Sequence, residues 1–178
     1  MTDTNRISVR HPLDLAHHIG CETIGDWFVI DQKLIQEFAE LSGDHNWIHL
    51  DVDRARRELP TEETIAHGLL TLCVTPRLGA GQLEIEALGM SINYGINHLR
   101  FTSMVPAGKR IRMRSTIMTV EPRSDGGVRV ATKRVVEIEG AGKPAMVAET
   151  VTLIYPKEME SAQRLTTPLD TAIPSTHK

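Results

Sequence analysis

The chain has 178 residues and a formal net charge of -3, with 40% hydrophobic and 24% charged side chains. This composition is typical of one globular domain with a hydrophobic core, and it excludes a strongly basic surface for nucleic acid or acidic membranes. Aromatic side chains are only 4%, which argues against stacking platforms for single-stranded nucleic acid. Cys21 and Cys73 are too few for a disulfide scaffold, and we expect reduced thiols in a cytoplasmic protein.

Residues 1–24 have a mixed composition and are predicted to form an N-terminal arm, with room for a short helix. They lack the uninterrupted apolar core of a secretory signal. No later apolar run approaches the roughly 20 residues that cross a bilayer, so no membrane span is expected.

The next segment, as far as residue 60, shows strand and helix signals in turn. "GDWFVI", residues 25–30, predicts a short strand. Asp31 then occupies an N-cap position before an amphipathic helix whose apolar side chains recur at helical spacing: Leu34, Ile35, Phe38, Ala39 and Leu41. Gly43 is placed to end this helix. A second short helix is predicted over 54–59, "RARREL", before Pro60.

A further helix is predicted from Gly68, and apolar residues lie on nearly all of its faces: Leu69, Leu70, Leu72, Cys73, Val74 and Leu78. A helix that is apolar all round is a buried helix. Because Gly68 begins it, the Gly68 N–H has no intrahelical acceptor, and it lies at the positive end of the helix dipole. The glycine also allows close packing against a sheet, and both roles are compatible.

Beyond residue 90 the period becomes that of strands. Strands are predicted over 91–103, 109–120, 128–139 and 144–155, with glycine-containing turns between them. These elements predict an α+β fold in which an antiparallel sheet wraps one long buried α-helix. The domain is expected to span 25–156, and 157–178, which contain two prolines and few apolar residues, to form a flexible tail.

One of the predicted strands carries a basic stripe on its polar face. Ile111, Met113 and Ile117 lie on one face of this strand, and the other face carries Arg110, Arg112 and Arg114. Together with Arg129 and Lys133, these arginines could contact the phosphates of a ligand; a solvated outer face of the sheet explains them equally well, and we favour that interpretation.

The loop "LSGDHNWIHLD", residues 41–51, holds the candidate chemistry. A carboxylate and an imidazole, Asp44 and His49, can face one point and hold a water for proton transfer. The alternative is that Asp44 accepts backbone hydrogen bonds in the turn and His49 packs under the second helix. Asn46 is expected to shape the turn rather than touch substrate. No metal is expected, because Gly43 separates His45 and His49 from the helix and no third ligand recurs nearby in the sequence.

Two motifs together resemble a known family. "SGDHNWIH", residues 42–49, followed by "IAHGLLT", residues 65–71, resembles the hydratase motif of MaoC-like dehydratases and R-specific enoyl-CoA hydratases. With "NYGINHLRF", residues 93–101, the chain is most similar to the nodulation-protein-N branch, and the resemblance covers 25–156. It implies a hot-dog fold, a homodimer, and an active site without metal or redox cofactor.

The resemblance also implies roles for individual residues. Asp44 and His49 become the catalytic pair, and the Gly68 N–H becomes the donor to a thioester oxygen that gains negative charge. Asn46, Trp47 and His67 are kept as candidates for substrate binding, and His67, like Asn46, is expected mainly to hold the shape of the loop. Many members of the family carry a proline where this chain has Trp47, so the difference bears on pocket shape and substrate range.

The implied activity is reversible syn hydration of trans-2-enoyl-CoA to the (R)-3-hydroxyacyl thioester, with acyl carrier protein as an alternative carrier. Coenzyme A enters as part of the substrate, so no separate cofactor is expected. One rival is a hot-dog acyl-CoA thioesterase, which attacks the carbonyl carbon. The other is a non-catalytic protein that binds acyl thioesters. The loop with Asp44, Asn46 and His49 favours hydration over both.

Overall fold

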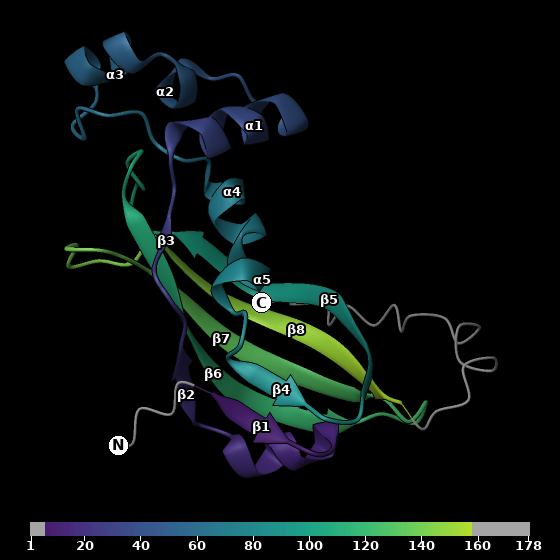
Figure 1. The fold of residues 1–178 in the computed structure, drawn as a ribbon. Helices are drawn as coiled ribbons and strands as arrows, with labels where there is room; N and C mark the ends of the chain where they lie inside the picture. The colour runs from purple at the N-terminus through teal and green to yellow at the C-terminus, as the bar shows by residue number, and fades with distance from the viewer. Residues whose placement is uncertain (1–5, 158–178) are drawn as a thin grey trace, which may run out of the picture.

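Six strands form one curved antiparallel sheet in the computed structural model, which describes residues 6–157 (Figure 1). Their order is β2-β6-β7-β8-β5, and β3 also pairs with β6. The bounds are β2 (Glu22–Ile24), β3 (Phe28–Val29), β5 (Leu88–Phe101), β6 (Arg110–Pro122), β7 (Val128–Ile138) and β8 (Met146–Pro156). The antiparallel sheet predicted from the alternating sequence is therefore confirmed.

Alternation places apolar side chains of the strands against the core. In β6, Ile111, Met113 and Ile117 are buried. The turns between strands use glycines in the left-handed region, where a Cβ would be strained: Gly108 has φ 83° before β6, and Gly126 has φ 78° between β6 and β7. The turn at Gly126 reverses the chain so that β7 pairs antiparallel with β6, whereas the segment at Gly108 leads from β5, at one edge, to β6 in another part of the sheet.

The helix inside the sheet is divided into α4 (Gly68–Cys73) and α5 (Thr75–Leu78). Pro76 lacks an N–H and cannot donate to the Leu72 carbonyl one turn earlier. The Thr75 hydroxyl donates to that carbonyl instead, at 2.8 Å. One long buried helix was expected; in the structure it is divided into two short segments near the proline, and Leu69 in the first of them is 56% exposed.

Residues 7–24, assigned to an arm from the sequence, pack against the domain. β1 (Ile7–Val9) pairs in parallel with β4 (Leu83–Ile85), a 3-10 helix η1 covers Pro12–His18, and β2 joins the main sheet. Leu15 is fully buried in a second apolar cluster with Val128 and Ile154. Three-residue strands and a 3-10 turn are too short to show a hydrophobic period, so the sequence pattern could not separate them from an arm.

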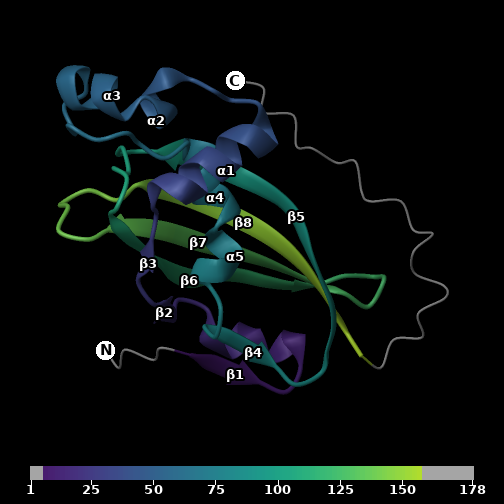
Figure 2. The same cartoon turned by 45° about the horizontal axis from the view of Figure 1, so that its top comes forward.

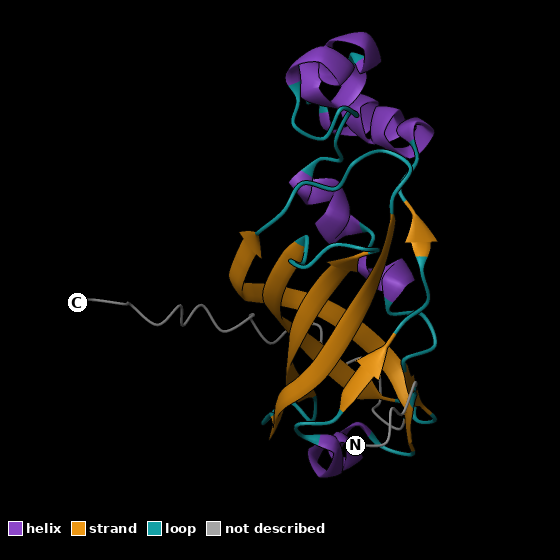
Figure 3. Ribbon diagram, turned by 90° about the vertical axis from the view of Figure 1, so that its left-hand side faces the viewer, coloured by secondary structure: helices purple, strands orange, loops and turns teal. Residues whose placement is uncertain are grey.

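Three helices cover one end of the sheet: α1 (Gln32–Ser42), α2 (Trp47–Leu50) and α3 (Val52–Glu58). They lie beyond the start of α4 and far from η1, which closes the opposite end (Figures 2 and 3). The loop with the candidate chemistry joins α1 to α2, so it lies at this end. No helix in residues 6–157 is long and apolar enough to cross a membrane. Of the predicted tail, residues 158–178 lie outside the described part of the chain.

Candidate active site

Local capping hydrogen bonds shape the loop between α1 and α2. Gly43 ends α1 in the left-handed region, with φ 75°. The Asp44 carboxylate accepts a hydrogen bond from the Asn46 N–H at 3.3 Å, and the Asn46 side chain accepts one from the Ile48 N–H at 3.3 Å. Asn46 is thus the N-cap of α2, and its side chain holds the loop in shape.

The His49 imidazole is buried and fixed in one tautomer. Its Nδ1 lies 2.7 Å from the carbonyl oxygen of Ile65. A carbonyl only accepts, so Nδ1 carries the hydrogen and Nε2 keeps its lone pair. Burial lowers the pKa of His49 below its ordinary value, and this outweighs the hydrogen bond to Ile65 and the charge of Asp44, which both raise it. His49 is therefore a neutral base at neutral pH.

The lone pair of His49 faces the carboxylate across a short gap. His49 Nε2 lies 4.0 Å from Asp44 Oδ2, and the Asp44 side chain is 56% exposed while that of His49 is 8% exposed. A separation of 4.0 Å is too long for a direct hydrogen bond and is of the length that a single water bridges. The structure thus brings together the two residues that the sequence assigned to catalysis.

His67 joins these two residues to form what we call the loop cluster: Asp44, His49 and His67. Its ring stacks on that of His49, with centroids 3.6 Å apart and planes inclined by 26°. His67 Nε2 donates to the backbone carbonyl of Asp44 at 3.0 Å, so its Nδ1 is the acceptor nitrogen. That Nδ1 is buried without a hydrogen-bond partner. His67 therefore holds the loop and leaves one unmet acceptor inside the cluster.

Hydrogen bonds from other segments of the chain also hold the loop in place, and the sequence pattern gave no signal for them. The Gln32 side chain, at the start of α1, donates to the His49 carbonyl at 2.8 Å and accepts from the Thr64 hydroxyl. The Ile65 N–H donates to the Ile48 carbonyl at 3.0 Å. Helix periodicity places Gln32 at the start of α1 but carries no signal for its partners, because these lie 17 and 32 residues away.

Gly68 begins α4 directly after His67. In the described part of the chain, no group accepts a hydrogen bond from its N–H. A Cβ at this position would lie 2.7 Å from the Phe101 ring, closer than atoms can approach without movement. The close contact between α4 and the end of β5 therefore favours glycine at this position, and its N–H follows His67 of the loop cluster directly in the chain.

Trp47, the first residue of α2, contacts α3 through its ring. The Arg54 guanidinium of α3 stacks over the Trp47 ring at 3.9 Å, so the indole packs between α2 and α3. Its assignment to substrate binding rests on the resemblance, and the geometry adds a cation–π contact that steadies α3.

The loop cluster also bears on metal binding. Donor atoms of Asp44, His49 and His67 lie within 4.8 Å of one another, so the argument that a third ligand is missing was wrong. The two imidazole planes are nearly parallel, however, and nitrogen lone pairs lie in the ring planes. They cannot converge on one ion at about 2.0–2.1 Å unless a ring rotates. The absence of a metal stays a prediction.

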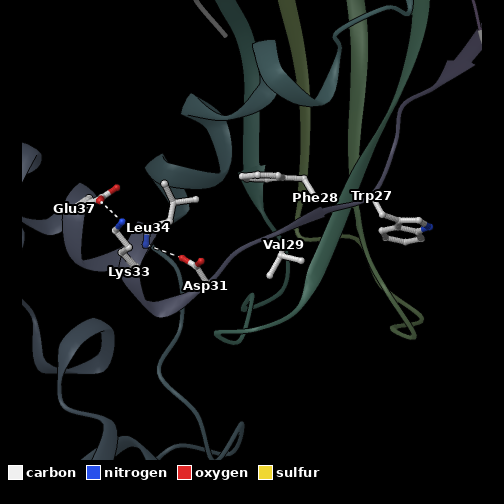
Figure 4. A pocket seen from close by; sticks show the side chains of 7 residues that line it. All are labelled: Trp27, Phe28, Val29, Asp31, Lys33, Leu34 and Glu37. Atoms are coloured by element: carbon white, nitrogen blue, oxygen red, sulfur yellow. Dashed lines mark hydrogen bonds and ion pairs between the residues drawn. The ribbon is translucent and has the colours of Figure 1, made fainter.

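Other hollows lie away from this cluster. A cavity of about 480 Å³ lies between β3 and α1, with Phe28 and Leu34 in its lining and Trp27 on the other side of the strand (Figure 4). Of its three charged side chains, Lys33 and Glu37 pair with each other at 3.8 Å on the exposed face of α1, and Asp31 caps this helix by accepting from the Leu34 N–H. This cavity shows no unmet polar group of the kind found in the loop cluster.

The basic stripe on β6 forms an outer ladder of ion pairs, made of Arg110, Arg112, Arg114, Glu22, Glu137 and Glu139. Glu137 accepts from Arg112 at 2.7 Å and from Arg114 at 2.6 Å, and Arg114 also reaches Glu22 at 2.6 Å. Arg110 pairs with Glu139. Each arginine has a carboxylate partner, so the stripe behaves as the solvated outer face expected from its alternation.

A curved antiparallel sheet around a central helix, with a loop that carries an acid and an imidazole near the start of that helix, is a hot-dog protein. Residues 16–139 match the family model of the MaoC like domain. The chain is 42% identical over 140 residues to 3-hydroxyacyl-thioester dehydratase Z of Mycobacterium tuberculosis, covering 78% of this chain and 91% of the relative. It therefore belongs to the MaoC-like dehydratase family.

Two further similarities support the branch and the fold. The chain is 35% identical over 143 residues to Nodulation protein N of Rhizobium leguminosarum bv. viciae, covering 79% of this chain and 89% of that protein. The solved structure of the R-hydratase PhaJ1 from Pseudomonas aeruginosa has a TM-score of 0.59 and 28% identity, and the match covers 85% of this chain and 90% of that chain. The resemblance to nodulation protein N and the hot-dog fold are both confirmed.

Proposed function

We propose that the protein catalyses reversible syn hydration of trans-2-enoyl thioesters to (R)-3-hydroxyacyl thioesters. The observation that carries the proposal is the 4.0 Å gap between Asp44 Oδ2 and the lone pair of His49 Nε2. Both atoms accept hydrogen bonds, so together they can take the two hydrogens of one water and direct its oxygen toward carbon 3. The named activity of the M. tuberculosis relative, dehydration of 3-hydroxyacyl thioesters, is the reverse of this reaction.

The proton transfers need only these two side chains. As the water oxygen bonds to carbon 3, one O–H bond breaks and its proton moves to His49 Nε2. The Asp44 carboxylate holds the other hydrogen and stabilises the imidazolium that forms. His49 then returns the proton to carbon 2 on the same face of the acyl chain, which makes the addition syn. The cycle requires neither a metal nor a redox cofactor.

Charge that develops on the thioester oxygen is assigned to Gly68. Its N–H lies at the start of α4, next to the loop cluster, and has no acceptor in the described part of the chain. A fixed donor at this point stabilises an enolate-like oxygen more than a neutral carbonyl. The same donor serves a thioesterase, so the site for water, and not Gly68, separates hydration from hydrolysis.

A homodimer is part of the proposal. β5 pairs with β8 on one edge only in the described sheet, and its 14 residues are mostly exposed. Large apolar side chains near this edge are 42–56% exposed: Leu69, Met90, Ile96, Phe101 and Met104. Phe101 contacts Gly68, so a partner seated on this edge also covers the active site. Sedimentation should give a dimer at micromolar concentration, and a fully active monomer would contradict this arrangement.

The reaction is tested with crotonyl-CoA in deuterated water. The expected product is (R)-3-hydroxybutyryl-CoA carrying deuterium at carbon 2, with loss of enoyl absorbance and little free thiol. Stoichiometric thiol release without a hydroxyacyl product identifies a thioesterase. Binding of acyl thioesters with no reaction, across several chain lengths and with both coenzyme A and acyl carrier protein, identifies a binding protein.

A further inference from the structure

A second, smaller cavity lies on the inner face of the sheet, away from the loop cluster. It has a volume of about 240 Å³ and is lined by residues of β4, β5, β7 and β8. Part of its wall is apolar, with Leu83, Leu88 and Ile154. The rest carries hydroxyl and amide groups, from Ser91, Asn93, Thr132 and Thr152. The cavity is therefore amphipathic and open at its rim, where Leu83 and Leu88 are 43% and 39% exposed, and it has room for a small organic molecule.

One charged side chain faces this cavity, and it has no counter-ion. Arg134 lines the cavity from β7, on the same face of the strand as Val136, which is fully buried. In the described residues no carboxylate lies within 4.0 Å of it, and its Nε is buried without a hydrogen-bond partner. Burial lowers the pKa of Arg134, which measures how unfavourable the uncompensated charge is.

The contrast with the outer ladder shows that this arrangement is unusual for the protein. Arg112 and Arg114, on the neighbouring strand, each contact Glu137 on the opposite face of the sheet. The Arg134 side chain is partly exposed, but its Nε is buried without a partner, which costs stability, and a bidentate anion would satisfy the parallel N–H groups of this guanidinium. The remaining unmet charge therefore points to a ligand.

We propose that this cavity binds a carboxylate carried on a short aliphatic body, with the carboxylate against the Arg134 guanidinium. A carboxylate fits because the lining holds a single positive charge, which matches a monoanion better than a phosphate dianion. Ser91 and Asn93 add neutral donors for the remaining oxygen lone pairs. The apolar wall formed by Leu83 and Leu88 receives the aliphatic body.

The carboxylate has two possible sources, and the fold separates them. Arg134 lines this cavity from β7, and the next residue on the same face of that strand, Val136, packs in the apolar cluster that also contains Leu70 of α4. A free short-chain carboxylic acid reaches the cavity independently of the active site. A carboxyl group at the far end of an acyl thioester reaches it only if the chain passes this cluster, and that source rests on the proposed hydration. Binding of a free acid does not depend on the reaction.

The binding test uses the full chain and isothermal titration calorimetry with hexanoate, and with hexanamide as the uncharged probe of the same shape. Hexanoate should bind and hexanamide should bind at least about tenfold more weakly, because only the anion pairs with Arg134. Arg134→Met should weaken hexanoate binding by about tenfold or more. Lys133→Met, the adjacent cation on the opposite face of β7, should change it by less than about twofold.

A second variant guards against misfolding of Arg134→Met. Asn93→Leu lies on the exposed edge strand β5, fills part of the cavity and keeps Arg134. It should also weaken hexanoate binding while preserving the circular dichroism of the wild type. Equal binding of acid and amide by the wild type, no binding of either, or unchanged hexanoate binding in both variants overturns the proposal.

A kinetic arm identifies the source of the carboxylate. The kcat/KM of a trans-2-enoyl-CoA with a terminal carboxyl group is compared with that of its methyl-terminated analogue, in the wild type and in Arg134→Met. The ratio of the two kcat/KM values, carboxyl-terminated over methyl-terminated, is the quantity of interest. If it is about tenfold lower in Arg134→Met than in the wild type, the cavity binds the acyl end of the substrate. An unchanged ratio together with lost hexanoate binding assigns it to a free acid. If no thioester reacts, the proposed hydration fails, and the calorimetry still decides the carboxylate site.

Discussion

The loop cluster and the outer ladder are both rich in ionisable side chains. In the ladder these side chains are paired with one another, whereas in the loop cluster some of their acceptor atoms have no partner. In the ladder, burial alone raises the pKa of Glu137, but hydrogen bonds from Arg114 and Arg112 outweigh it, and the pKa lies below its ordinary value. Every guanidinium of the ladder has a carboxylate partner within 2.7 Å. In the loop cluster, His49 Nε2 and Asp44 Oδ2 stay 4.0 Å apart, and His67 Nδ1 has no partner.

This difference separates side chains that stabilise from side chains that react. Charged side chains that are paired with each other have no free donor or acceptor for a substrate. At a partly exposed surface each such pair contributes at most about 1 kcal/mol to stability. Buried acceptors with free lone pairs cost stability and are kept where a ligand or a proton completes them. Substitutions in the two regions should therefore have opposite consequences for turnover.

The largest effect is expected at Asp44 and His49. Asp44→Asn and His49→Ala should each lower turnover of the best enoyl thioester by about 100-fold or more, since both hold the same water. The double variant should have little less activity than the less active of the two single variants, because groups that act as a unit are not additive. Circular dichroism checks folding, and near-normal turnover in both single variants would refute the assignment.

A smaller loss is expected from Gly68→Ala. The added methyl would lie 2.7 Å from the Phe101 ring, so the ring or α4 must shift. We expect a loss of stability of about 1 kcal/mol by urea denaturation. Turnover should fall by about tenfold as the N–H is displaced. Phe101→Ala in the same chain removes the obstacle and should restore most of the stability. If it restores none, the Phe101 contact is not the constraint on this glycine.

The pH dependence sharpens the role of the histidine pair. His49 acts as a base when neutral, and burial lowers its pKa below 6.5. The acid limb of kcat/KM should therefore lie below pH 6.5 and fall as the pH decreases. The unfolded chain binds this proton first, so folding stability should also decrease as the pH falls through 6.5. An acid limb above 6.5 would exclude His49 as the group that titrates.

A substitution of His67 tests this assignment of the pH dependence of kcat/KM. His67 lowers the pKa of His49, so His67→Phe, which keeps an aromatic ring over His49, should move the acid limb to higher pH. It also removes the hydrogen bond to the Asp44 carbonyl, and we expect kcat to fall by about tenfold while KM changes little. A purely structural role would lower stability without moving the pH profile.

The smallest effect is expected in the outer ladder. Glu137→Gln removes the carboxylate shared by Arg112 and Arg114, whose side chains are 28% and 30% exposed. Stability should fall by about 1 kcal/mol or less, and kcat/KM should not change. A large loss of activity in this variant would show that the ladder takes part in substrate binding and would remove the contrast between the two regions.

Local pattern in the sequence was enough for several features of this protein. The period of apolar residues and the cap residues Asp31 and Gly43 determine α1, because helix periodicity and capping act within a few residues. Alternation predicts β6, with its buried isoleucines and outer arginines. The loop motif places Asp44 and His49 five residues apart, so one turn of chain brings both side chains to the same point.

Contacts between distant segments were decided only by the tertiary structure. His67 stacks on His49 from 18 residues further along the chain, and the Ile65 carbonyl selects the His49 tautomer. Arg134 and Arg112 look alike as alternating cations in strands, yet Arg134 has a buried Nε without a partner, whereas Arg112 is paired with Glu137. Periodicity assigns a side chain to one face of an element. The hydrogen-bond partner of a buried polar atom depends on which distant backbone or side chain the fold brings within about 3 Å of it.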